Sequence, residues 1–128
     1  MVLYGRLRPY LRKVIMTDFE GHCSTEIFPI LPNSLINGSF LLYWLLSEIT
    51  TKKIDSTWTG ARMPRADMNK VLDFKIVLPS IEKQEQIVEK LDKLQEQTKQ
   101  LEAIYTQKIK DLDELKQSIL QKAFRGEL

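Results

Sequence analysis

Cysteine and histidine are nearly absent from this 128-residue sequence, which contains one of each, Cys23 and His22. A single cysteine excludes an internal disulfide framework and is typical of a protein that works in a reducing cytoplasm. One histidine beside one cysteine also supplies too few ligands for a zinc site or a histidine-based catalytic site. We therefore expect a cytoplasmic protein that is stabilised by neither disulfides nor a metal.

Long apolar runs and catalytic motifs are missing too. The longest apolar run, residues 40–46, is too short to cross a bilayer, and early basic residues interrupt any signal-peptide pattern. The sequence has no phosphate-binding glycine loop, no nucleophile elbow and no evident pair of catalytic carboxylates. Glu26, Asp55, Asp67 and Asp73 are interpreted as turn, cap or surface residues. The sequence thus predicts no membrane association, no cofactor and no enzymatic activity.

The strongest pattern present lies in the last third of the chain, where residues 80–124 are predicted to form one long amphipathic helix. From Ile87 onward, mostly apolar positions recur in alternating steps of four and three residues and would form the contact seam of a coiled coil. Their average spacing of three and a half residues is typical of that structure. The apolar residues that we expect at a partner interface are Ile87, Leu91, Leu94, Leu101, Tyr105, Leu112, Leu115 and Ile119. Such a helix would extend roughly 60 Å, too far to bury its stripe against the rest of the chain. It therefore needs a partner helix.

Signals for both ends of this helix are present. Ser80 is a plausible N-cap. The negative charges of Glu82 and Glu85 would interact favourably with the positive N-terminal end of the helix dipole. Gly126 is the expected residue just beyond the last turn. These signals divide the chain into a globular head, residues 1–79, and a helix, residues 80–128.

The head is predicted to mix strands and helices, which gives an α+β fold class with a long C-terminal coiled-coil helix. Strand-like patterns occur at residues 2–4, 6–16, 24–31 and 74–78. Helical patterns occur at residues 37–50 and, as a short turn, at 66–71. Pro9 makes the second strand an edge or a bend, and alternation places Leu7, Tyr10 or Leu11, and Val14 toward the core.

Positive charge is concentrated in the head. Residues 1–79 hold ten basic and seven acidic residues, a net charge of +3, whereas residues 80–128 hold nine and ten, a net charge of −1. Arginine and lysine suit phosphate contacts, and arginine also suits guanine edges. The candidate DNA-binding residues are Arg6, Arg8, Arg12, Lys13, Lys52, Lys53, Thr59 and Arg62. The alternative is a solvated basic strand edge that only discourages aggregation.

Five segments resemble one family. Residues 78–92 (LPSIEKQEQIVEKLD) and 115–128 (LKQSILQKAFRGEL) resemble the two ends of the spacer helix of type I restriction-modification specificity subunits. Residues 3–13 (LYGRLRPYLRK), 23–27 (CSTEI) and 59–65 (TGARMPR) are similar to segments of that family's target recognition domain. The chain departs from the family pattern at one place: the family usually has Glu-Gln where this chain has Lys83-Gln84.

The resemblance implies a non-catalytic DNA-specificity subunit or half-subunit, with part of a target recognition domain in residues 1–79 and a spacer and dimerisation helix in residues 80–128. It implies DNA, methyltransferase subunits and a restriction subunit as partners. The methyltransferase subunits would bring S-adenosylmethionine and the restriction subunit ATP and magnesium, so this chain would hold none of them. Because the family pairs two spacer helices antiparallel and this chain encodes one, we expect an antiparallel homodimer. The alternative is a coiled-coil interaction module whose head does not read DNA.

Overall fold

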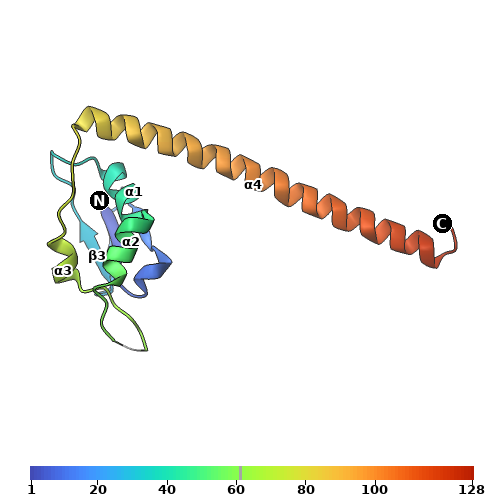
Figure 1. The fold of residues 1–128 in the computed structure, drawn as a ribbon, viewed down its shortest axis with the longest axis horizontal. Helices are drawn as coiled ribbons and strands as arrows, with labels where there is room; N and C mark the ends of the chain where they lie inside the picture. The colour runs from blue at the N-terminus through green and yellow to red at the C-terminus, as the bar shows by residue number, and fades with distance from the viewer. Residues whose placement is uncertain (61) are drawn as a thin grey trace. The chain divides into compact units, whose positions relative to one another are not determined.

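In the computed structural model, which describes residues 1–60 and 62–128, short strands and helices precede one long helix (Figure 1). Their bounds are β1 Val2–Gly5, the 3-10 helix η1 Pro9–Leu11, β2 Val14–Met16, β3 Ile27–Ile30, α1 Gly38–Leu46, α2 Glu48–Asp55, α3 Met68–Leu72 and α4 Ile81–Phe124. The chain divides into two units, Met1–Glu89 and Lys90–Leu128. The predicted α+β class with a long C-terminal helix is confirmed.

The sheet is antiparallel and has the strand order β2-β1-β3. Side chains of β1 alternate between the two faces of the sheet. Those of Val2 and Tyr4 are buried in the core that the strands share with α1 and α2, and that of Leu3 is only half-buried. Burial, with a smaller contribution from the charge of Asp55, raises the pKa of Tyr4 to about 12. Tyr4 therefore packs as a neutral phenol, and its burial positions the chain for the turn that follows.

The predicted helix over residues 37–50 is divided into two. Asn37 caps α1 as expected, since its side chain accepts hydrogen bonds from the amides of Ser39 and Phe40. Ser47 then adopts an extended backbone, and its hydroxyl oxygen accepts a hydrogen bond from the Thr50 amide at 3.3 Å. Because Ser47 ends one helix and caps the next, the prediction of a single helix is wrong, and α2 extends to Asp55.

Residues 6–16 form a turn followed by a short strand. Pro9 is fully buried, whereas Tyr10 and Leu11 are 53% and 52% exposed, so the expectation that one of those two faces the core is wrong. The 3-10 geometry of η1 replaces the strict alternation on which that expectation rested. Val14 is buried as predicted.

The strand predicted at residues 74–78 is absent, because this segment pairs with neither edge of the sheet in the described part of the chain. Its alternation is nevertheless present: Phe74 and Ile76 pack against the core, and Val77 is 94% exposed. The prediction of a strand is therefore wrong, since strand pairing depends on a neighbour that the local pattern does not reveal.

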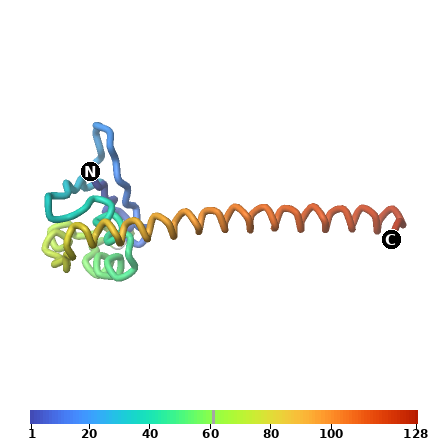
Figure 2. The backbone as a smooth tube through the Cα atoms, turned by 90° about the horizontal axis from the view of Figure 1, so that it is seen from above, coloured from blue at the N-terminus to red at the C-terminus, as the bar shows by residue number. Residues whose placement is uncertain are grey.

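Helix α4 has the ends that were predicted for it and runs unbroken along the tube in Figure 2. The Ser80 hydroxyl accepts a hydrogen bond from the Lys83 amide, and Gly126 has a left-handed φ of 72°. A helix of 44 residues extends roughly 66 Å. Within the described residues, no helix is both long enough and apolar enough to span a membrane.

Candidate nucleic-acid interface

Three segments with predicted DNA-binding residues lie next to one another in the head. Backbone bridges join Leu7 to Arg65 and Thr59 to Arg65, and the Arg8 amide donates to the Pro64 carbonyl oxygen at 2.8 Å. The 3-10 helix η1 of the turn is also in contact with α2, which carries Lys52 and Lys53. The structure therefore brings residues 6–13, α2 and residues 59–65 together, although they are distant in the sequence.

The basic turn, residues 8–13, is held in a strained conformation. Arg8 and Arg12 both have left-handed backbones, with φ values of 53° and 49°. For a residue with a long side chain this conformation costs roughly 1–2 kcal/mol. The burial of Pro9 and two turn hydrogen bonds, from Leu11 to Arg8 and from Arg12 to Pro9, offset the cost. The side chains of Arg8, Arg12 and Lys13 remain exposed beside Tyr10 and Leu11.

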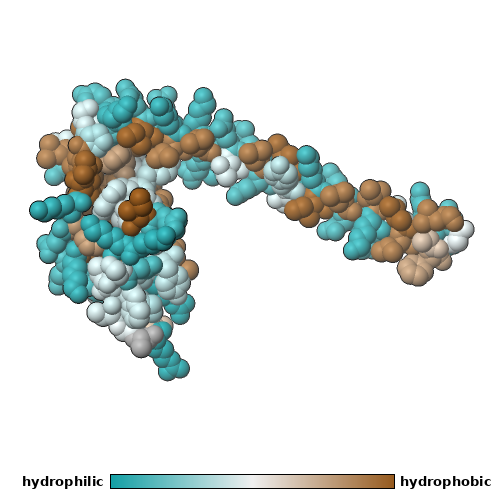
Figure 3. Space-filling view, viewed as in Figure 1, coloured by the Kyte–Doolittle hydropathy of each residue, from teal (hydrophilic) through white to brown (hydrophobic). Residues whose placement is uncertain are grey.

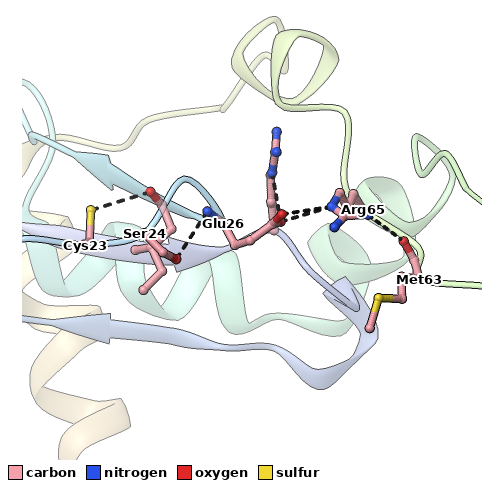
Figure 4. A network of polar contacts seen from close by, with 7 residues as sticks. Cys23, Ser24, Glu26, Met63 and Arg65 are labelled. Atoms are coloured by element: carbon pink, nitrogen blue, oxygen red, sulfur yellow. Dashed lines mark hydrogen bonds and ion pairs between the residues drawn. The ribbon is translucent and has the colours of Figure 1, made fainter.

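Arg6 and Arg65 are drawn together by Glu26, which the sequence analysis assigned only to a turn or surface. The Arg6 Nε lies 3.2 Å from Glu26 Oε2, and the Arg65 Nε lies 3.0 Å from Glu26 Oε1. Figure 4 shows the contact between Glu26 and Arg65. Hydrogen bonding from Arg65, supported by Arg6, holds the pKa of the Glu26 carboxyl below its usual value. The guanidinium of Arg6, 5.8 Å from the Phe28 ring centre, is therefore engaged within the protein.

We expect Glu26→Gln to lower the stability of the head at neutral pH, because the two guanidinium groups lose their common carboxylate. Since the pKa of Glu26 is lowered by folding, its contribution is present above the pKa of the unfolded state and is lost as the pH falls through the folded pKa. The difference in melting temperature between wild type and variant should therefore shrink on acidification. A difference that persists unchanged below that pKa would contradict this assignment.

The remaining predicted residues are also at the surface. Lys52 is paired with Glu48 at 2.6 Å, and the Lys53 ammonium lies 4.4 Å from the centre of the Phe74 ring. An exposed ion pair such as Lys52–Glu48 contributes little to stability, so it would not prevent Lys52 from turning toward a ligand. Thr59 and Arg62 are exposed in the loop, while Ala61 of the quoted segment 59–65 lies outside the described residues.

No cluster of three or more potential metal ligands occurs in residues 1–60 and 62–128. The exposed polar groups of the three segments are guanidinium, ammonium and hydroxyl groups beside the Tyr10 ring, and the exposed Glu48 carboxylate is paired with Lys52. Guanidinium and ammonium groups bind phosphate oxygens, and an exposed aromatic ring stacks on a base. The arrangement is suited to binding an anionic polymer.

The predicted partner interface on α4 is exposed over most of its length. Ile87 and Leu91 are half-buried, whereas the apolar residues beyond them are mostly about half exposed (Figure 3): Leu94, Leu101, Tyr105, Leu112, Leu115 and Ile119. Ile104 and Ile109 also lie exposed on α4, at 50% and 62%. The sequence analysis missed them because they flank the seam instead of following its repeat. They widen the apolar stripe beside Lys108.

Comparison with known proteins identifies relatives for nearly the whole chain. The family described as "Type I restriction modification DNA specificity domain" has a sequence profile that matches residues 7–111. The chain is 32% identical over 127 residues to the type I restriction enzyme EcoDI specificity subunit of Escherichia coli, covering 99% of this chain and 28% of that protein. It is 30% identical over 122 residues to the EcoBI specificity subunit of the same organism, covering 90% of this chain and 24% of that protein. The chain thus spans about a quarter of the length of these curated relatives.

Proposed function

Because this chain belongs to the type I restriction modification DNA specificity domain family, we propose that it is a DNA-specificity subunit or half-subunit of a type I restriction-modification system. In this role it binds DNA and docks methyltransferase subunits, and it catalyses no reaction itself. The observation that carries the proposal is that two basic segments, residues 6–13 and 59–65, meet in one part of the head with α2, which carries Lys52 and Lys53. The expected location is the cytoplasm.

The exposed groups divide naturally into two roles on DNA. Arg8, Arg12, Lys13 and Arg62 would contact phosphates or base edges, while Arg6 and Arg65 are held by their ion pairs with Glu26. S-adenosylmethionine would be carried by the methyltransferase subunits, and ATP and magnesium by the restriction subunit. No step of the proposed role requires a cofactor in this chain.

The stripe of α4 would be covered by the same helix of a second copy, running antiparallel. One antiparallel register is self-complementary throughout the seam, since it pairs Leu91 with Leu115, Leu94 with Leu112, Leu101 with Tyr105, Ile87 with Ile119 and Thr98 with Lys108. Parallel pairing would instead place Lys108 against Lys108 of the second copy, which is unfavourable inside a seam. The antiparallel pair would carry one DNA-binding head from each copy, as a two-part target requires.

A co-purification experiment tests the proposed function. The full chain, expressed with the methyltransferase subunit of a type I system, should be retained with that subunit, and the complex should retard duplex DNA. Retention of the subunit and of DNA together supports the specificity role. Self-association with retention of neither would favour the alternative, a coiled-coil interaction module without DNA recognition.

A further inference from the structure

Gln84 differs from every other residue that the structure describes in α4, because its side chain is completely buried, with 0% exposure. A buried amide that lacks partners is costly, and the cost is avoided only when its donors and acceptor are all satisfied. In Gln84 both donor hydrogens and the acceptor oxygen of the amide have partners. The burial therefore reflects a specific polar joint and not apolar packing.

The partners of Gln84 come from three places. Its Oε1 accepts a hydrogen bond from the Asn37 amide at 2.8 Å. Its Nε2 donates to the carbonyl oxygens of Leu35 at 3.0 Å and Pro79 at 2.9 Å. Asn37 in turn caps α1 with its own side chain. One amide thus joins the first turn of α4, the segment that leads into it and the start of α1.

Only a primary amide of this length can make these three bonds. A glutamate would retain the acceptor for Asn37 but would present a second oxygen to the carbonyls of Leu35 and Pro79. A leucine would fill the space and leave one amide and two carbonyl groups without this partner. The chemistry of the site therefore selects glutamine.

We propose that Gln84 is a positioning residue that holds the first turns of α4 as a fixed part of the head. Residues 81–89 belong to the same unit as the strands, in agreement with such a joint. The consequence for DNA rests on the proposed function: a fixed helix start would restrict a paired assembly to one spacing between the two halves of its target. A loose start would tolerate several spacings.

Spin labels test the joint without DNA. The sole cysteine, Cys23, is exposed, so a single Glu89→Cys change supplies a second label within the unit Met1–Glu89. The wild-type background should give a narrow distance distribution, and Gln84→Leu a clearly broader or shifted one. Gln86→Leu, which changes an exposed glutamine of the same turn, is the matched control and should leave the distribution narrow. An unchanged distribution in Gln84→Leu would overturn the proposal.

Amide hydrogen exchange on the unaltered chain provides a second measurement, which remains decisive if Gln84→Leu does not fold. The Asn37 amide should be protected because it donates to Gln84, and Gln84→Glu, with the acceptor kept and the two donations lost, should speed its exchange by roughly 10-fold or more. Exchange of the Asn37 amide at the rate of an unprotected amide in the wild type would contradict the proposed role of Gln84.

Selection from a randomised duplex library separates this inference from the proposed function. The wild type should enrich two-part sites with one spacing, and Gln84→Leu should enrich several spacings while the recognised half-sites stay the same. A single unaltered spacing in Gln84→Leu would refute the consequence for DNA. A wild type that enriches no sequence would instead refute the proposed function, and the spin-label distances would then decide on the joint alone.

Discussion

Replacing Arg8 and Arg12 together by glutamine is expected to weaken DNA binding roughly 100-fold at low salt, since each charge-assisted contact contributes about 1.5 kcal/mol. Both side chains are exposed on the basic turn, and among the described residues neither forms an ion pair such as that between Arg6 and Glu26. The slope of log affinity against log salt should fall by roughly one unit for each phosphate contact that is lost. Fluorescence anisotropy with a labelled duplex, titrated at several salt concentrations, measures both quantities.

The matched control for this variant is Lys75→Gln with Lys83→Gln. It also removes two positive charges, from exposed positions outside residues 6–13, α2 and residues 59–65, so it should change the affinity and the salt slope much less. Equal losses in the two double variants would mean that only net charge matters. Unchanged binding after loss of Arg8 and Arg12 would assign the basic turn to a solvated edge of the sheet.

The elements that the sequence predicted correctly are those whose signals are local. The apolar run before Gly5 predicted β1, and Ser80 and Gly126 predicted the ends of α4, because strand runs and helix caps act over a few residues. Ser47 was missed because its apolar neighbours continue the helical pattern while its hydroxyl caps a new helix. The alternation of residues 74–78 predicts a strand, although none of the strands in the described part of the chain pairs with this segment.

The candidate site shows the same division between local and tertiary information. Runs of basic residues in the sequence pointed to the turn and the loop. They did not reveal that Glu26 forms ion pairs with Arg6 and Arg65, whereas Arg8 and Arg12 remain exposed. Gln84 was missed because a glutamine in a polar helix gives no sign of burial. Its partners lie 47 and 49 positions earlier in the chain, so only the folded structure brings them together.

Glutamate at both Leu101 and Leu112 is expected to convert a homodimer into a monomer. Each buried leucine contributes roughly 1.5–3 kcal/mol, and the two substitutions act twice in a symmetric dimer. Both leucines are largely exposed in the single chain, at 53% and 64%, so their loss should not unfold the head. Light scattering on the pure protein at micromolar concentration measures the mass, and circular dichroism should show the head intact.

Gln100→Glu with Gln117→Glu adds the same charge away from the stripe and should leave the dimer in place. A wild-type chain that remains monomeric would refute the proposed pairing. A dimer that survives both leucine substitutions would place its interface elsewhere.

The direction of pairing can be measured by cysteine crosslinking in a Cys23→Ser background. In the self-complementary antiparallel register, Leu94 of one copy lies opposite Leu112 of the other, so the double variant Leu94→Cys, Leu112→Cys should form intermolecular disulfides rapidly. Neither single variant should do so, because antiparallel helices hold two copies of residue 94 far apart along the axis. In parallel helices the single variants would crosslink as well as the double variant, since each cysteine would then face its own copy across the seam. Rapid crosslinking of the single variants would therefore exclude the two-headed antiparallel arrangement, even if the chain is a dimer.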